Sequence, residues 1–148
     1  MLPRLMSPKE KLALARASGA EVTVNAKSPD AAEQIVQQTG GGAHGVLVTA
    51  VSPTAFAQAL KMVRRKGTVS LVGLPPGGFR TPIFDAVMNR ITIRCSILGG
   101  REGLAEAIAF VTEDKVRPEI HKTKLDKINQ VFADLKAGTI DGRAVLML

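Results

Sequence analysis

Three consecutive glycines, Gly40, Gly41 and Gly42, are the residues of this chain whose type and spacing suggest a phosphate-binding loop. Such a loop follows a β-strand and opens a helix, because the free N–H groups and the dipole of a helix N-terminus then face the anion. Here the order is reversed, since the glycines follow a predicted helix over 30–39 and precede a predicted strand over 45–51. We therefore interpret them as a helix C-cap and turn rather than a phosphate cradle.

The other side chains that could do chemistry are few and isolated. His44 falls in a predicted turn before a strand and His121 in a charged loop, and no acid stands at a metal-ligand spacing from either. Cys95 is expected on a buried strand face as an inert thiol, and a single cysteine excludes an internal disulfide and a multi-cysteine zinc site. Asp85 and Glu102 suit the first turns of helices. These residues predict no catalytic group and no metal site.

The chain carries a net charge of +7, which could attract nucleic acid or an anionic cofactor. Its tightest basic cluster, Arg64 to Lys66, stands just before Gly67, and cations in a last helical turn complement the helix dipole. The chain has no Trp and no Tyr, which argues against a module that stacks nucleic-acid bases. We expect no nucleic-acid partner.

Length and hydropathy are those of a single-domain globular protein. The chain has 148 residues, enough to bury a core, and its hydrophobic content is 45%. No apolar run reaches the length of a membrane span, and the N-terminus lacks the continuous apolar region of a signal peptide. We expect a cytoplasmic protein with no membrane partner.

Predicted strands and helices alternate along the chain. Three Ser-Pro pairs, at Ser7, Ser28 and Ser52, each predict a helix start, because Ser can cap a helix and Pro suits its first turn. Near-continuous apolar strands are typical of a parallel sheet buried on both faces, so the alternation predicts a doubly wound α/β fold. The predicted strands are Val22–Val24, Val46–Val51, Thr68–Leu74, Ile91–Ile97 and Arg143–Leu148, and later helices cover 102–112 and 124–136, the second capped by Gly138.

Small and turn-forming residues follow three of these strands, in 49–52, 72–78 and 95–100. Ligands of an open parallel sheet bind beyond the carboxyl ends of its strands, and small residues let the backbone approach a flat ligand closely. Each segment taken singly could equally serve only to turn the chain. The three together favour a nucleotide-type cleft.

Five stretches give the chain a resemblance to a known family. They are KLALARASGAEVTVNA, GGAHGVLVTAVS, GTVSLVGLPPG, TPIFDAVMNRITIRCSILGGR and INQVFADLKAGTIDGRAVLML. In order and spacing they resemble the C-terminal half of zinc-dependent medium-chain alcohol dehydrogenases, especially the bacterial propanol-preferring type. The resemblance covers nearly the whole chain after Ser7.

The resemblance implies that residues 1–118 form a partial dinucleotide-binding domain and that 119–148 return into the catalytic domain of the family. It also implies an oxidoreductase fold with NAD as the cofactor and zinc as the metal of the family. It places Lys11 at the adenosine ribose, Arg143 at the pyrophosphate and the three strand ends along the rest of the cofactor. The expected cofactor-binding residues are Lys11, Thr49, Ala50, Val51, Val72, Gly73, Leu74, Ser96, Ile97, Leu98 and Arg143.

Several parts of the family pattern have no counterpart in this sequence. The first strand and its GxGxxG turn are missing, so we expect a truncated Rossmann-type doubly wound parallel sheet. The zinc-binding residues of the catalytic domain and the four-cysteine lobe are also missing, so this chain is not expected to bind zinc. Met6 stands where the family has the acid that binds the ribose hydroxyls, Pro3 opposes strand pairing within 1–6, and Cys95 replaces a usual Gly.

Two functions are compatible with these departures. The first is a fragment of an NAD-dependent zinc alcohol dehydrogenase, whose parent reaction converts an alcohol to an aldehyde or ketone with hydride transfer to NAD. On its own it would be inactive, with NAD binding weak or lost. The second is a non-catalytic oligomerisation module that pairs with itself or with a full-length dehydrogenase subunit through the Ile91–Ile97 edge strand. Loss of the central strand leaves two adjacent edges, so the remaining strands must close up or another chain must fill the gap.

Overall fold

The computed structural model describes residues 4–6, 9–137, 139–140 and 142–148. These residues form two compact units, 1–98 and 99–148. The predicted helix start at Ser7-Pro8, the Pro3 argument and the Gly138 cap lie outside the described residues.

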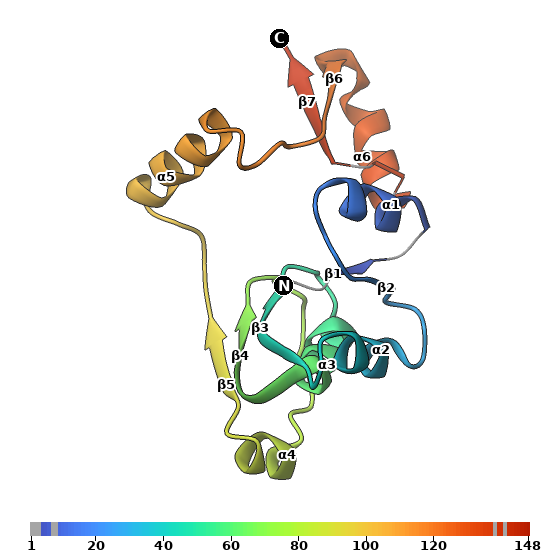
Figure 1. Ribbon diagram of the computed structural model, residues 1–148. Helices are drawn as coiled ribbons and strands as arrows, with labels where there is room; N and C mark the ends of the chain where they lie inside the picture. The colour runs from blue at the N-terminus through green and yellow to red at the C-terminus, as the bar shows by residue number, and fades with distance from the viewer. Residues whose placement is uncertain (1–3, 7–8, 138, 141) are drawn as a thin grey trace. The chain divides into compact units, whose positions relative to one another are not determined.

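The first unit alternates strands and helices as predicted (Figure 1). All its described strand pairs are parallel, which confirms an α/β fold with parallel sheets. The elements are β1 (Arg4–Met6), α1 (Lys9–Ala17), β2 (Thr23–Asn25), α2 (Ala31–Gln38), β3 (Ala43–Val48), α3 (Pro53–Met62), β4 (Val63–Leu71), α4 (Ile83–Met88) and β5 (Thr92–Cys95).

The strands of this unit belong to two separate sheets rather than one. β1 pairs with β2, while β3, β4 and β5 form a three-stranded sheet in that order. Among the described residues no ladder joins β1 to β3, so the remaining strands do not close up into a continuous sheet. β1 still pairs with β2 over its full length, from Arg4 opposite Thr23 to Met6 opposite Asn25. Strand pairing therefore persists in this N-terminal segment.

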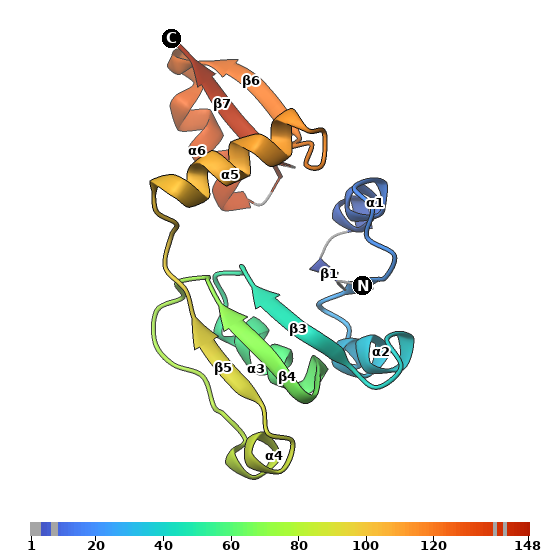
Figure 2. The same cartoon turned by 60° about the vertical axis from the view of Figure 1, so that its left-hand side comes forward.

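One hydrophobic core joins the two sheets of the first unit. Val24 of β2, Ile35 of α2 and Val69 of β4 are its largest fully buried side chains. Across this core the Gln58 side-chain amide donates to the Ala26 carbonyl at 3.3 Å, which links α3 to the end of β2. The figures show α3 against one face of the β3–β4–β5 sheet (Figures 1 and 2).

The prediction that the sheet is buried on both faces is wrong for this unit. Leu47 of β3 is 60% exposed, although its neighbour Val48 is buried. Alternate residues of a strand point to opposite faces. The face that carries Val48 is therefore covered by the core, and the face that carries Leu47 is open to solvent in this unit.

The Gly40–Gly42 run behaves as the sequence predicts. All three glycines have positive φ, between 65° and 111°. The Gly41 N–H donates to the Val36 carbonyl at 2.9 Å, which closes the last turn of α2. The glycines therefore end a helix and begin a strand, and they do not form a strand-to-helix phosphate loop.

The start of α2 differs from the prediction. The helix begins at Ala31, within one residue of the predicted range 30–39, but not at the Ser28-Pro29 pair. The Ser28 hydroxyl donates to the Asp30 carboxylate instead of capping the helix, and the Ala31 N–H bonds the Ser28 carbonyl at 3.2 Å. Ser28 is thus part of a turn, whereas Ser52 is the N-cap residue of α3 with Pro53 in its first turn, as predicted.

The expected position of the basic cluster is also wrong. α3 ends at Met62, and Arg64, Arg65 and Lys66 lie within strand β4 instead of a last helical turn. The buried Val63 adopts extended backbone angles and pairs with Ala43, so the chain leaves the helix before the cluster. A helix-dipole role therefore does not apply to these three cations.

Three chemistry-bearing residues also lie in other settings than expected. His44 belongs to β3 rather than to a turn, because the strand begins earlier, at Ala43. His121 belongs to strand β6 (Ile120–Lys124), which pairs with β7 (Arg143–Met147), rather than to a loop. Cys95 is exposed, because it ends the outer strand β5, all of whose residues are exposed.

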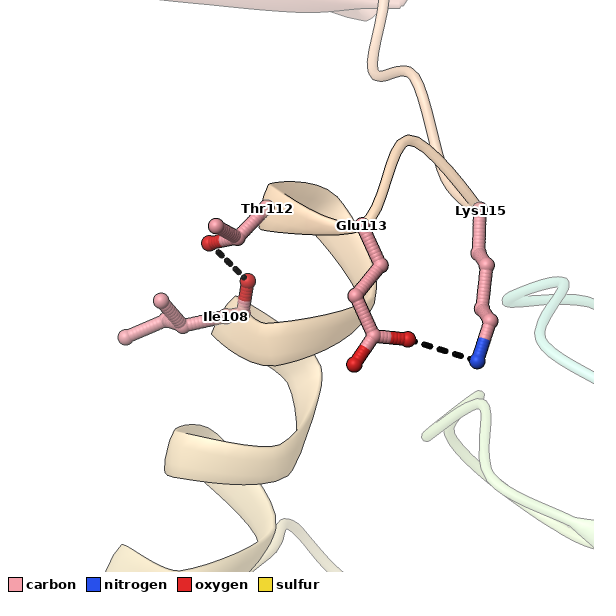
Figure 3. A network of polar contacts seen from close by, with 4 residues as sticks. All are labelled: Ile108, Thr112, Glu113 and Lys115. Carbon is pink, nitrogen blue, oxygen red and sulfur yellow. Dashed lines mark hydrogen bonds and ion pairs between the residues drawn. The ribbon is translucent and has the colours of Figure 1, made fainter.

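The second unit contains α5 (Arg101–Thr112), the parallel pair β6–β7, a 3₁₀ turn (Leu125–Lys127) and α6 (Ile128–Ala137). The predicted helix over 102–112 is confirmed. At its end the Thr112 hydroxyl donates to the Ile108 carbonyl at 3.0 Å, and Lys115 forms a 2.6 Å ion pair with Glu113 (Figure 3). Asp85 and Glu102 lie in the first turns of α4 and α5, as predicted.

Candidate functional site

The carboxyl ends of β4 and β5 border a cavity of about 560 Å³. The strand-end segments after β4 and β5 contribute Gly73, Leu74, Ser96 and Ile97 from the predicted site, which the structure brings together. The remaining lining residues are Pro53, Phe56, Leu71, Pro75, Gly77, Gly78, Phe79 and Cys95. A cavity of this size is typical of a small-molecule or cofactor site.

Gly73 allows the ends of β3 and β4 to lie close together beside the cavity. Its N–H and that of Val72 both donate to the Val48 carbonyl, at 2.9 and 3.0 Å, which ties the end of β4 to the end of β3. A Cβ at Gly73 would collide with the carbonyl of Ala50. Only glycine allows the two segments to lie this close, so the cavity depends on this residue type.

Other predicted residues lie at the same strand ends but not on the cavity lining. Thr49, Ala50 and Val51 directly follow β3, and all three are exposed. Leu98 follows the β5 end and is 92% exposed. Val72, also exposed, adjoins the lining residue Gly73.

Two of the predicted cofactor-binding residues, Lys11 and Arg143, do not lie at the carboxyl ends of β3, β4 or β5. Lys11 lies in α1, half-buried. Arg143 opens β7 in the second unit, where its N–H donates to the Glu119 carbonyl at 2.9 Å and its side chain is exposed. The structure does not test the cofactor contacts expected of either residue, and they stay predictions.

Sequence reasoning missed the aromatic wall of the cavity. Phe56 of α3 and Phe79 meet edge to face, with ring centroids 5.5 Å apart and an interplanar angle of 67°. Phe56 is a buried residue of α3, and Phe79 directly follows Gly77 and Gly78 in the chain. The position of Phe79, a large apolar residue directly after two glycines beyond a strand end, was the sequence signal that could have predicted its place in the cavity wall.

The cavity is apolar and uncharged. Its lining holds no Asp, Glu, Lys, Arg or His, and its polar side chains are the Ser96 hydroxyl and the Cys95 thiol. Nothing in the lining can serve as a general base of ordinary strength or as an anion-binding cation. The arrangement suits the binding of a flat ring against backbone and apolar groups rather than acid–base chemistry.

The residues present do not fit zinc. Among the residues that the structure describes, no group of three or more His, Cys, Asp or Glu could hold a metal ion. Catalytic zinc needs three protein ligands of these types. No step through zinc is therefore assigned to this chain.

The fit to a dinucleotide is partial. The apolar cavity at the carboxyl edge, with Gly73, Gly77 and Gly78 in its lining, suits a flat ring. The pyrophosphate of a dinucleotide needs a glycine-rich turn from a strand into a helix, and the Gly40–Gly42 run makes the opposite connection.

In the described part of the first unit, none of the helices is long and apolar enough to cross a membrane, and the same holds in the second.

Comparison with known proteins agrees with this geometry. Residues 6–113 match the sequence profile of the zinc-binding dehydrogenases. The chain is 51% identical over 139 residues to an alcohol dehydrogenase of Rhizobium meliloti (strain 1021), a match that covers 94% of this chain and 41% of that protein.

Solved structures show the same likeness. The alcohol dehydrogenase of the hyperthermophilic archaeon Aeropyrum pernix superposes with a TM-score of 0.91 at 29% identity, over 99% of this chain and 42% of that one. An NAD-dependent alcohol dehydrogenase superposes with a TM-score of 0.88 at 25% identity, over 99% of this chain and 43% of that one. The chain thus spans about two-fifths of the length of these relatives.

Proposed function

Because the chain belongs to the zinc-binding dehydrogenase family, we propose that it supplies one wall of the NAD-binding cleft of an alcohol dehydrogenase and does not catalyse the reaction by itself. The observation that carries this proposal is the cavity beyond β4 and β5, with Gly73 pressed against Ala50. In an open parallel sheet this edge is where a nucleotide binds.

Within this proposal, the chain's own residues position part of the cofactor. The backbone around Gly73 and Ser96 would receive a flat ring of NAD, and the edge-to-face pair of Phe56 and Phe79 would exclude water behind it. Lys11 would reach the adenosine ribose and Arg143 the pyrophosphate, as in the family that the chain resembles. When bound, NAD supplies the hydride acceptor for oxidation of an alcohol.

The missing groups support the non-catalytic half of the proposal. The described residues contain no metal-ligand cluster, and the cavity lining contains no carboxylate, imidazole or amine. Positioned acids, bases or metal ions are what accelerate the transfer of a hydride from an alcohol. A wall that carries none of them can bind and orient a cofactor but cannot activate the substrate.

A turnover assay tests this directly. The purified chain is incubated with ethanol, NAD and zinc, and NADH is followed by its absorbance. We expect no turnover above buffer. In a second sample the chain is co-expressed with the remaining, amino-terminal part of the Rhizobium meliloti relative, and here we expect NADH formation. Turnover by the chain alone would overturn the proposal, and so would an inactive but properly assembled mixture.

A second function is favoured by the free edge of the three-stranded sheet. β5 is its outer strand, all four of its residues are exposed, and its second edge has no partner among the described strands. An unpaired edge is a template for pairing with another chain. We propose that the chain forms a homo-oligomer, or pairs with a longer dehydrogenase subunit, through 91–97.

Size-exclusion chromatography with light scattering tests the oligomer. We expect a dimer or higher species in the micromolar range, and a shift toward monomer in Ile93→Lys, because a lysine on the edge strand opposes pairing. The matched control is Leu98→Lys, beyond the end of β5. A monomer at high protein concentration would refute this second function and leave the cleft proposal intact.

A further inference from the structure

A basic bulge stands at the amino end of the three-stranded sheet, whereas the cavity lies at the carboxyl ends of β4 and β5. Ala43 pairs with Val63 and Gly45 with Thr68, so four residues of β4, Arg64–Gly67, lie opposite one residue of β3, His44. Bulges of this kind re-aim side chains and are often functional. Here three of the four bulged residues are cations.

The bulge is held in a defined shape. The Arg64 guanidinium lies 2.7 Å from Nε2 of His44 and, because it has no acceptor atom, donates to this ring nitrogen. A Cβ at Gly67 would overlap the His44 carbonyl at 2.9 Å, so the return of the chain passes close to β3. These contacts fix Arg64 beside an imidazole rather than leaving it free in solvent.

A fourth cation joins the bulge from the next connection. The Lys66 N–H donates to the Asn89 carbonyl at 2.8 Å, which brings the α4–β5 turn against the bulge. Lys66 and Arg90 both adopt left-handed backbone angles, with φ of 62° and 54°. Such angles are uncommon for long side chains and are a reason to look for function.

The charge of this region is not compensated. Residues 34–100 contain seven Lys and Arg and one acid, Asp85, a net of 7 − 1 = +6. Among the described residues, the ion pairs are Lys115 with Glu113 and Arg117 with Asp114, both in the second unit. The seven cations are Lys61, Arg64, Arg65, Lys66, Arg80, Arg90 and Arg94.

We propose that Arg64, Arg65, Lys66 and Arg90, with His44, form a binding site for a small oligophosphate anion. Guanidinium and ammonium groups form short charge-assisted hydrogen bonds with phosphate oxygens, and Arg binds them in a bidentate manner. The cations are confined to one bulge and one turn, which matches a compact anion rather than an extended backbone. The chain has no Trp or Tyr for base stacking, which also disfavours a nucleic acid. This inference does not depend on the NAD proposal.

Calorimetric titration of the full chain with sodium tripolyphosphate tests the site. The variant is R65Q/K66Q/R90Q, and the matched control is K122Q/K124Q/K127Q, which removes the same charge from exposed positions of the second unit. At about 0.02 M ionic strength we expect binding that weakens about tenfold or more in the variant and less than threefold in the control. Equal weakening in both, or no binding by the wild type, would overturn the site.

Two further measurements keep the test decisive. If the triple variant does not fold by circular dichroism, amide chemical shifts of the wild type are followed during titration. Perturbations concentrated in 44–45, 64–67 and 89–91 support the site, and perturbations spread over all exposed cations refute it. Titration with a short single-stranded oligothymidylate is the second measurement. Tighter saturable binding of the oligonucleotide than of tripolyphosphate would replace this proposal with a nucleic-acid site.

Discussion

The Gly73→Ala substitution is the sharpest test of how the cavity is built. A methyl at this position would collide with the carbonyl of Ala50. The segment cannot easily move away, because the N–H groups of Val72 and Gly73 both donate to the Val48 carbonyl. The collision can be relieved only by moving backbone at the end of β3 or β4. Overpacking of this kind costs about 1–3 kcal/mol.

Part of this cost is offset in the unfolded chain. Replacing Gly by Ala stabilises a protein by about 0.4–1 kcal/mol through the entropy of the unfolded state. Gly78 lines the same cavity, has no positive φ, and a Cβ there meets nothing within 4 Å, so Gly78→Ala carries that gain alone. We therefore expect Gly73→Ala to lie about 1–3 kcal/mol below Gly78→Ala in unfolding free energy.

Urea unfolding followed by far-ultraviolet circular dichroism measures this difference. With a slope of about 2 kcal/mol per molar urea, the midpoints of the two variants should differ by about 0.5–1.5 M. Equal midpoints for Gly73→Ala and Gly78→Ala would mean that the strand ends are not in contact as described. The proposed contact between Gly73 and Ala50 would then be refuted.

Other predictions concern the core, a surface carboxylate and the second unit. Ile35→Ala should cost about 2–5 kcal/mol of unfolding free energy, because Ile35 is fully buried, whereas Leu98→Ala at a 92% exposed position should change it by less than about 0.5 kcal/mol; similar urea midpoints would contradict the core. The hydrogen bond from Ser28 lowers the pKa of Asp30, so the stabilisation is present above the unfolded pKa and is lost as pH falls through the folded pKa. Carboxyl NMR titration should show the pKa of Asp30 rising toward its usual range in Ser28→Ala, and an unmoved value would refute the contact. Gly142→Ala should destabilise the β6–β7 pair, because Gly142 has a φ of 80° and a Cβ there would collide with the carbonyl of Glu119, the residue before β6. Amide hydrogen exchange in β7 should become faster, and an unchanged exchange rate would contradict this prediction.

The regular elements were predictable because local signals and packing agree. The Ser52-Pro53 pair begins α3 as expected, and the glycine run ends α2 with positive φ. The positions of the strand ends also followed from the order of strands and helices. Parallel topology then placed Gly73 and Ser96 at one edge without any knowledge of side-chain contacts.

The errors arose where tertiary contacts overrule local pattern. The cations after Met62 read as a helix end, but the buried Val63 pairs with Ala43 and turns the chain into a strand. Cys95 was expected on a buried strand face but is exposed, because a strand pattern identifies a face without saying whether anything covers it. The covering groups of a face lie elsewhere in sequence, so local spacing cannot reveal them.

The binding of NADH to the purified chain tests the central claim most directly, and isothermal titration calorimetry measures it. The chain is proposed to carry the ring-binding wall of the cleft, while its glycine run is a helix cap rather than a phosphate loop. The account predicts millimolar binding or none. Micromolar binding by the chain alone would contradict it, because the cofactor site would then be complete without a phosphate loop.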